Sequence, residues 1–355
     1  MNMLKSSHLI SSHLISSYNY VLLKFRKVKN IFRENGFYGC VIVARKICNK
    51  ILYRYYYTDR YWENDHMRRN FNFFRRTKKF EKPLYIIRRR DGIVGLFSYF
   101  ITDIGAIAYA HENNMLPVID MQNTPNAYLY ENEIGKINAW EYYFKQPAGI
   151  SVNEAKSCKK YYLSRDSIYF KRPNIKLNND DLKYWRDIRR KYIKFTAPVI
   201  DGVNKLENKF KNKKVLGVLL RGTDYTSLRP KGHPIQPEPE QVILKAREVM
   251  KEKNFNAVYL ATEDKNIMLK FKNYFGENLL LPEQDFINYD GKGYLINYSG
   301  ERQNDKYLRG LEYLISCVYL SRLNGFITSQ TSGSTGIAVL SDGFEYLHVF
   351  NLGVY

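Results

Sequence analysis

The sequence has few cysteines, and their arrangement suggests neither a disulfide framework nor a metal site. Its 355 residues include four cysteines, Cys40, Cys48, Cys158 and Cys317, with no CxxC or CxxxC spacing. The six histidines are scattered and form no HExxH pattern. This composition fits buried thiols in a reducing compartment, and it predicts neither disulfides nor a metal bound by the protein.

Long apolar runs are also absent. No window reaches the roughly 18 uninterrupted apolar residues that a membrane-spanning helix needs. The start carries a short tandem repeat, SSHLI at 6–10 and again at 11–15, and lacks the apolar core and cleavage site of a signal peptide. We interpret this start as an extension outside the fold, and we expect a cytoplasmic protein.

Positive charge is concentrated near the amino terminus. The formal net charge is +21, and residues 1–82 contain 18 Lys and Arg against 5 Asp and Glu, so +13 of it lies there. In residues 18–57, apolar and basic residues alternate at helical spacing, which predicts amphipathic helices lying on an anionic membrane surface. Helices packed onto the first domain with a solvated basic face are the alternative. Residues 58–82 are predicted to be an exposed basic connector.

A βαβ unit follows this segment. Residues 84–87 and 115–120 are short apolar runs that predict strands, and residues 93–113 carry an apolar face at helical spacing. Strand, glycine turn, helix and strand in this order predict a parallel sheet with a right-handed crossover. An aromatic cluster at 138–144 contains one carboxylate, Glu141, and is interpreted mainly as core.

The second half is organised around the stretch 214–225. Its apolar run predicts a buried parallel strand that ends in a polar loop, and open α/β sheets bind ligands at that edge. Arg221 places a forked cationic donor there, which suits a diphosphate, and Asp224 adds a carboxylate. The alternative is that Arg221 and Asp224 only pair with each other.

Two further strands are predicted to end at the same edge. The strand 257–261 leads into Thr262-Glu263-Asp264, whose side chains suit a ribose or base, with capping of the next helix by Asp264 as the alternative. The strand 325–328 leads into the Ser/Thr/Gly-rich stretch 329–336, which opens a helix predicted to begin at Ile337. Hydroxyls and backbone N–H groups at a helix amino terminus bind anions, which favours a ligand-binding loop here, with a simple linker as the alternative. The stretch lacks the GxxxxGK[ST] pattern of an ATPase P-loop.

Five motifs follow one another in this half, and their order is more specific than any one of them. They are Arg221-Gly222-Thr223-Asp224, His233-Pro234-Ile235, Val258-Tyr259-Leu260-Ala261-Thr262-Glu263-Asp264, Leu308-Arg309-Gly310 and Thr328-Ser329-Gln330. In this order they resemble the donor-binding half of the α1,6-fucosyltransferase family and its relatives, which are GT-B enzymes that use GDP-fucose. The resemblance covers about residues 214–340. The first half resembles the family only in its βαβ opening.

The resemblance implies roles for the matching residues. Arg221 would hold the β-phosphate and stabilise charge on the departing GDP. Thr262, Glu263 and Asp264 would lie near the guanosine. The other donor-binding residues would be Gly222, Thr223, His233, Ser329, Gln330, Thr331 and Ser332. No metal and no other cofactor would be needed.

Two positions depart from the family pattern. Leu219 stands two residues before Arg221, where the family commonly has histidine, and Arg229 stands where its proposed general base lies. The carboxylate that activates the acceptor is therefore open among Asp224, Asp91 and Glu141, and we take Asp224 as catalytic together with Arg221.

We therefore expect an α/β fold of the GT-B type, with two Rossmann-like parallel-sheet domains facing a cleft. The expected parts are a basic amphipathic amino-terminal helical extension at 1–82, an acceptor-side domain at 83–205 and a domain for the nucleotide-sugar donor at 206–355.

The expected function is inverting, metal-independent transfer of fucose from GDP-fucose, or a related nucleotide sugar, to a glycan acceptor in surface or capsular polysaccharide synthesis. A lipid-linked acceptor would meet an enzyme bound peripherally to the inner membrane face. The alternatives are a GT-B enzyme using another nucleotide sugar and, from charge alone, a basic nucleic-acid-binding protein. The sequence shows neither a helix-turn-helix nor an RNP-type motif, so we expect no nucleic-acid partner.

Overall fold

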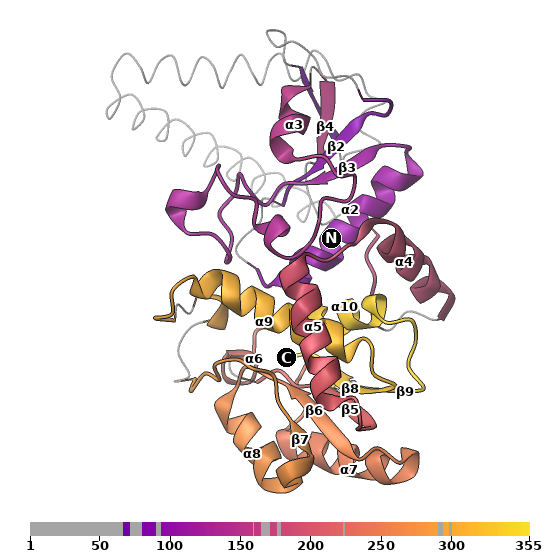
Figure 1. Cartoon of the computed structure of the whole chain (residues 1–355), viewed down its shortest axis with the longest axis vertical. Helices are drawn as coiled ribbons and strands as arrows, with labels where there is room; N and C mark the ends of the chain where they lie inside the picture. Colours follow the sequence, from indigo (N-terminus) through magenta and orange to yellow (C-terminus); the bar gives the residue numbers. More distant parts are fainter. Residues whose placement is uncertain are drawn as a thin grey trace, which may run out of the picture. The chain divides into compact units, whose positions relative to one another are not determined.

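Two β-sheets organise the part of the chain that the computed structural model describes. This part comprises residues 67–71, 80–89, 94–158, 160–164, 171–175, 179–222, 224–289, 294–297 and 300–355. Residues His66–Tyr355 form one compact unit (Figure 1). The amphipathic helices expected in residues 18–57 lie outside the described residues.

The first sheet has the strand order β1-β4-β2-β3. Strand β2 pairs in parallel with both β3 and β4, whereas β1 pairs antiparallel with β4. The expected parallel βαβ opening is therefore confirmed in β2, α2 and β3. The elements of this half are β1 (Met67–Phe71), β2 (Leu84–Ile87), α2 (Leu96–Glu112), β3 (Leu116–Ile119), α3 (Val152–Ser157), β4 (Lys160–Ser164), α4 (Asn179–Tyr192) and α5 (Ala197–Phe210), with 3₁₀ turns η2 (Glu131–Glu133) and η3 (Ala139–Tyr142).

The second sheet is entirely parallel, with the order β7-β6-β5-β8-β9. Its first strand along the chain, β5, is central: the next two strands lie on one side of it and the last two on the other. In such doubly wound sheets the order reverses at a switch point, here between β5 and β8, where the loops leave the sheet in opposite directions and open a crevice. The elements of this half are β5 (Val215–Leu219), α6 (Asp224–Leu228), α7 (Pro239–Lys253), β6 (Ala257–Ala261), α8 (Lys265–Phe275), η4 (Gly276–Asn278), β7 (Leu279–Leu280), η5 (Leu295–Asn297), α9 (Asp305–Leu320), β8 (Gly325–Ser329), α10 (Ser332–Leu340) and β9 (Tyr346–Phe350).

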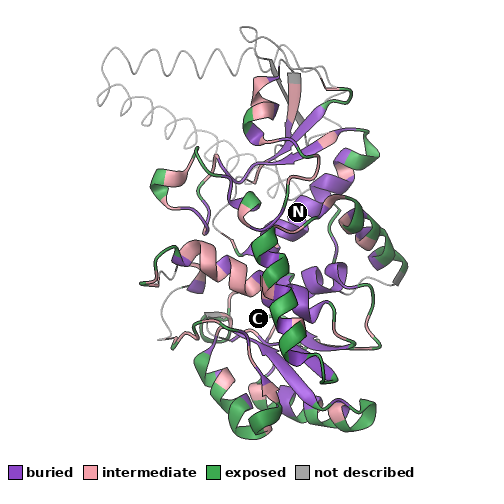
Figure 2. Cartoon of the chain, viewed as in Figure 1, coloured by how far each residue is buried: buried purple, intermediate pink, exposed green. Residues whose placement is uncertain are grey.

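One hydrophobic core spans both sheets. It joins one face of the first sheet, α2, η3 and α5 to α9, α10 and one face of the second sheet. Helices α7 and α8 cover the other face of the second sheet, and α3 covers the other face of the first. Figure 2 shows α2 and the central strands as largely buried, while the outer sides of α5, α7 and α8 are exposed. At the centre of this core, Phe97 of α2 packs directly against Gly336 of α10.

Several elements differ from the expectation. Residues 67–71, predicted as part of a connector, form β1, and β9 was not predicted. Helix α10 begins at Ser332 rather than at Ile337, because Thr331 caps it by accepting a hydrogen bond from the amide of Ser334. Helix α5 runs through the predicted boundary between residues 205 and 206, so the three domain ranges stay predictions.

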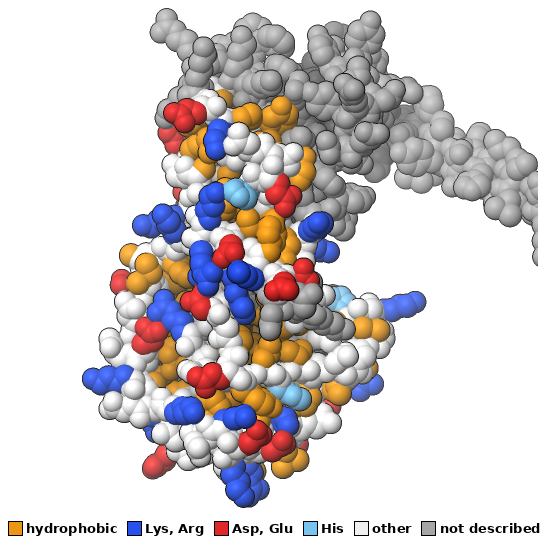
Figure 3. Space-filling model, turned by 90° about the vertical axis from the view of Figure 1, so that its right-hand side faces the viewer, with side chains coloured by type: hydrophobic (Ala, Val, Ile, Leu, Met, Phe, Trp, Pro, Cys, Tyr) orange, Lys and Arg blue, Asp and Glu red, His pale blue; other side chains and the backbone are white. Residues whose placement is uncertain are grey.

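Charges of both signs are mixed on one face of the molecule (Figure 3). In Figure 3 the Lys and Arg side chains are interspersed with Asp and Glu on the face shown. In the described part of the chain, no helix combines the length and apolarity needed to cross a bilayer.

Candidate functional site

A cleft of about 1740 Å³ lies at the carboxyl edge of the second sheet. The loops after β5, β6 and β8 and the first turn of α10 line it on one side. The start of α2 and Arg89, which follows β2, line it on another. Since parallel strands end at the same edge, residues more than 100 positions apart in sequence, such as Arg221 and Gln330, meet in one cleft.

Arg221 projects into the cleft just beyond β5. The amide of Leu220 donates to the carbonyl of Ala261 at 3.1 Å, which ties this strand end to β6. The Arg221 guanidinium lies over the ring of Tyr225, 3.9 Å from its centroid. A Cβ on Gly222 would overlap the side chains of Ile267 and Asp264, so a larger residue there would require both side chains to move. The sequence thus positions Arg221 between a fixed strand end and an aromatic ring.

The end of β6 contributes two of its three predicted residues. Thr262 and Glu263 line the cleft, whereas Asp264 is buried and does not. The Asp264 carboxylate accepts hydrogen bonds from the amides of Asn266 and Ile267 at 2.8 and 3.1 Å, and so caps α8. The capping alternative for Asp264 is therefore confirmed.

The end of β8 and the start of α10 also line the cleft. Gln330, Thr331 and Ser332 line it, but Ser329 is buried and donates its hydroxyl hydrogen bond to Gln236. The amides of residues 334 and 335 are satisfied by Thr331. The amides of the first two helical residues, Ser332 and Gly333, have no carbonyl partner within the helix, because no earlier turn supplies one. They are therefore available to an anion.

His233 lines the cleft from the segment after α6. Its ring packs edge-on against Tyr225, with centroids 5.2 Å apart. The backbone of this segment is held by residues 353–355: the amides of Gly232 and Ile235 donate to the carbonyls of Tyr355 and Gly353 at 3.0 Å, and the amide of Tyr355 donates to His233 at 3.0 Å.

Further basic residues line the cleft, and of these only Arg309 lies in one of the five sequence motifs. They are Arg89, Arg172, Arg302, Lys306 and Arg309. The positive charge of Arg302 is compensated by carboxylates. Arg302 pairs with both carboxylate oxygens of Glu312 at 2.6 and 3.2 Å and with Asp305 and Asp285 at 3.0 Å. These pairs hold the pKa of Arg302 above its usual range. Arg89 follows the end of a parallel strand, as Arg221 does. This position in the sequence could have predicted that Arg89 lies in the cleft.

A buried carboxyl lies beneath Arg89. Arg89 donates to the carbonyl and hydroxyl of Ser98 at 3.1 Å and lies over the ring of Tyr99. Asp103, one turn further along α2, is buried, and its Oδ2 has no hydrogen-bond partner among the described residues. Burial raises the pKa of Asp103 to about 8, with Arg89 opposing the shift, so this carboxyl is mostly protonated at neutral pH.

Two tyrosines, Tyr128 and Tyr313, also line the cleft. Burial raises the pKa of Tyr128 and of Tyr313 well above the usual range, while the charge of Arg221 lowers both. Arg309 has the same lowering effect on Tyr128. Both hydroxyls therefore stay protonated and are within electrostatic reach of Arg221.

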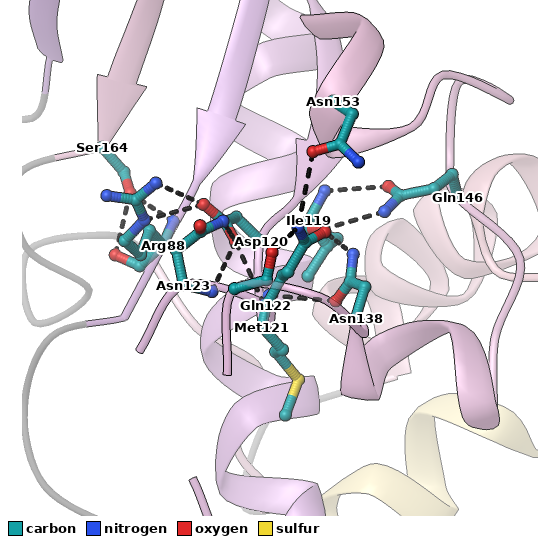
Figure 4. Close-up of polar contacts among 11 residues, drawn as sticks. Arg88, Ile119, Asp120, Met121, Gln122, Asn123, Asn138, Gln146, Asn153 and Ser164 are labelled. Carbon is teal, nitrogen blue, oxygen red and sulfur yellow. Dashed lines mark hydrogen bonds and ion pairs between the residues drawn. The ribbon is translucent and has the colours of Figure 1, made fainter. Parts of the chain in front are cut away.

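The carboxyl edge of the first sheet holds a polar cluster that does not line the cleft (Figure 4). Arg88 pairs with the buried carboxylate of Asp120, through Nε at 2.8 Å, and its amide donates to Ser164. Asp120 also accepts hydrogen bonds from the amides of Gln122 and Asn123 at 3.1 Å. All of these bonds are internal, so the cluster fixes the ends of β2, β3 and β4.

The remaining predicted residues fall elsewhere. Asp91, Thr223 and the side chain of Asp224 lie outside the described residues, so the pairing of Asp224 with Arg221 stays untested. Glu141 is not in the cleft; its Oε1 accepts from Gln146 at 2.8 Å and from Asn138 at 3.2 Å. Among the described residues, no group of three His, Cys, Asp or Glu side chains is placed to hold a metal ion.

No family model and no curated protein matches this chain. Solved structures share its chain path loosely. NodZ α-1,6-fucosyltransferase soaked with GDP-fucose is 16% identical over 73% of this chain and 93% of its own, with a TM-score of 0.43. Fucosyltransferase NodZ from Bradyrhizobium is 14% identical over 72% and 93%, with a TM-score of 0.42. POFUT1 in complex with GDP-fucose is 10% identical over 78% and 99%, with a TM-score of 0.43. At these values the likeness does not carry a functional assignment.

Proposed function

We propose that this protein is a glycosyltransferase that transfers fucose from GDP-fucose to a glycan acceptor. One observation carries the proposal: Arg221, Glu263, Gln330 and the amino terminus of α10 converge on one cleft at the switch point of a doubly wound sheet. These groups come from motifs whose order resembles the GDP-fucose-dependent enzymes. The switch point is where this sheet type binds nucleotides.

The donor fits the charges of the cleft. A diphosphate between Arg221 and the amides of Ser332 and Gly333 would receive a forked cationic donor and the positive end of the α10 dipole. Glu263 would accept hydrogen bonds from the N–H groups of guanine, and Thr262 and His233 would line the same nucleoside. We propose this orientation because Glu263 is the half-buried carboxylate at the end of β6.

The reaction needs stabilisation of the departing diphosphate. Arg221 and the α10 amides supply positive charge where negative charge grows as the sugar–phosphate bond breaks. This arrangement supports a reaction without a metal. Inversion at the anomeric carbon requires the acceptor hydroxyl to attack from the face opposite to the GDP. Asp224 remains the proposed base for that hydroxyl.

The setting we propose is synthesis of a surface or capsular polysaccharide. The excess of +13 in residues 1–82 would attract an anionic leaflet and so bring the enzyme to a lipid-linked acceptor. A chain lacking residues 1–65, which precede the compact unit His66–Tyr355, should bind vesicles of anionic phospholipid less well than the full chain. Equal binding by both chains would contradict this setting.

Calorimetric titration with GDP, UDP, CDP and GDP-fucose tests the donor. Arg221→Ala should weaken GDP binding at least about tenfold, because a hydrogen-bonded ionic contact contributes about 1.5–3 kcal/mol. Arg247→Ala, at an exposed position of α7, is the matched control and should bind GDP normally. Binding of UDP or CDP in preference to GDP would favour another nucleotide sugar. No nucleotide binding at all would overturn the proposal.

A further inference from the structure

A second pocket, of about 380 Å³, adjoins the cleft. Its size falls within the roughly 300–1,000 Å³ of small-molecule sites. Four of its nine lining residues are tyrosines and two are glutamates, and none is lysine or arginine. The lining residues are Tyr128, Tyr130, Glu133, Glu141, Tyr142, Thr196, Pro198, Asn304 and Tyr307.

The tyrosine rings form a rigid wall. Tyr142 and Tyr307 meet edge to face with centroids 5.1 Å apart, and Tyr307 stacks on the buried Tyr143. The Tyr143 hydroxyl donates to the backbone carbonyl of Tyr307 at 3.1 Å. Tyr128 packs edge to face on Tyr143 from the other side. Because Tyr143 is fully buried and fixed in this way, the rings facing the pocket are held in place before any ligand arrives.

The two carboxylates are only partly used by the protein. Oε2 of Glu133 accepts the amide of Tyr130 at 2.8 Å, and Oε1 of Glu141 accepts from Asn138 and Gln146. Among the hydrogen bonds of the described residues, the second oxygen of each carboxylate has no donor. Tyr142 lies within electrostatic reach of Glu133: burial and the charge of Glu133 both raise the pKa of the Tyr142 hydroxyl. The pocket therefore offers acceptors beside flat apolar rings.

The pocket borders the cleft. Tyr128 lines both. At the border, Lys306 lines the cleft, lies 4.8 Å from the ring centroid of Tyr130 and donates to the carbonyl of Leu129 at 2.7 Å. A ligand in the pocket thus lies next to the part of the cleft reached by Arg221 and Arg309.

We infer that this tyrosine pocket binds an uncharged sugar ring, as the acceptor subsite of the transferase. The inference rests on the proposed function for its catalytic meaning. A pyranose has apolar C–H faces that pack on tyrosine rings and hydroxyls that donate hydrogen bonds to carboxylates. The tyrosine rings of the pocket match the C–H faces, and the carboxylate oxygens of Glu133 and Glu141 match the hydroxyls. Glu133 and Glu141 give the pocket negative charge, which disfavours a uronate or a phosphorylated sugar.

The test measures sugar binding separately from donor binding. Cellobiose, lactose and N,N′-diacetylchitobiose are titrated by saturation-transfer NMR into the full chain, with cellobiouronic acid as the anionic comparison. We expect at least one neutral disaccharide to bind more tightly than the anionic one. Tyr142→Ala, Tyr307→Ala and Glu141→Gln should each weaken that binding about fivefold or more, since each removes a ring or a charged acceptor. Tyr274→Ala, an exposed tyrosine of α8, is the matched control.

GDP titration of the same variants separates the two proposals. Normal GDP affinity in Tyr142→Ala, Tyr307→Ala and Glu141→Gln shows that the fold and the donor site are intact. If no neutral disaccharide binds, or if Glu141→Gln and both alanine variants bind it as well as the unchanged chain, the inference is overturned. If sugar binding follows the expectation but no nucleotide binds, the subsite stands as a glycan site and the transferase proposal fails.

Discussion

The Arg221 guanidinium stacks on the ring of Tyr225, 3.9 Å from the ring centroid, and the same ring packs against His233. Such cation–π contacts contribute about 0.5–2 kcal/mol, more when desolvated. Tyr225→Ala should therefore weaken GDP binding about 3- to 30-fold by releasing Arg221, whereas Tyr225→Phe keeps the ring and should bind normally. Calorimetry on both variants checks this, and equal losses in both would show that the hydroxyl matters instead.

The contact between Phe97 and Gly336 predicts a loss of stability. A Cβ at position 336 would overlap the Phe97 ring, and overpacking of a core costs about 1–3 kcal/mol. Gly336→Ala should lower the midpoint of urea unfolding accordingly. Gly95→Ala is the control, because a Cβ there meets no atom within 4 Å. Equal midpoints for the two variants would contradict the packing described.

Asp103 predicts a dependence of stability on pH. Its pKa is raised to about 8 in the folded state, against an ordinary value near 4 in the unfolded state. Between these values the unfolded chain has released the proton while the folded chain keeps it. Stability therefore falls as pH rises from about 4 to 8, by up to about 4 kcal/mol at pH 7.

Asp103→Asn should flatten this dependence, because the amide does not titrate. Urea unfolding at pH 5, 6, 7 and 8 checks the slope. Asp201→Asn, at an exposed position of α5, should keep the slope of the unchanged chain. An unchanged slope in Asp103→Asn would assign the dependence to other groups.

Residues 353–355 are predicted to support donor binding. Three backbone hydrogen bonds join them to the segment that carries His233, and each contributes about 0.5–1.5 kcal/mol. Removing these residues should weaken GDP binding about as much as His233→Ala does. Combining both changes should add little, because they act on one segment. Additive losses would mean that the two act independently.

The sequence predicted β5, β6 and β8 of the second sheet because their signals are local. Each of these strands is an apolar run followed by polar residues, and chain direction places the polar ends at one edge. The antiparallel pair of β1 and β4 was missed since residues 67–71 are rich in arginine and their pairing with residues 160–164 is set by tertiary contacts.

The site was predicted in part for the same reason. Arg221, Glu263 and Gln330 follow predicted strands, and the structure brings them together. The role of Asp264 was ambiguous, because it stands both at the end of a strand, where it could contact a ligand, and just before a helix, which it could cap. Arg302 could not be found, because it lies in a loop before α9 and the sequence does not tell which cleft its side chain enters, whereas Arg309 belongs to the Leu308-Arg309-Gly310 motif.

The Phe97–Gly336 contact also constrains how the chain folds. These residues are more than 200 positions apart, yet both belong to the core shared by the two sheets. Contacts of such long range are slow to form, because a large loop must close before they are gained. We therefore expect folding to be limited by the joining of α2 to α10. We also expect that either half of residues 66–355 expressed alone would leave apolar surface uncovered and aggregate.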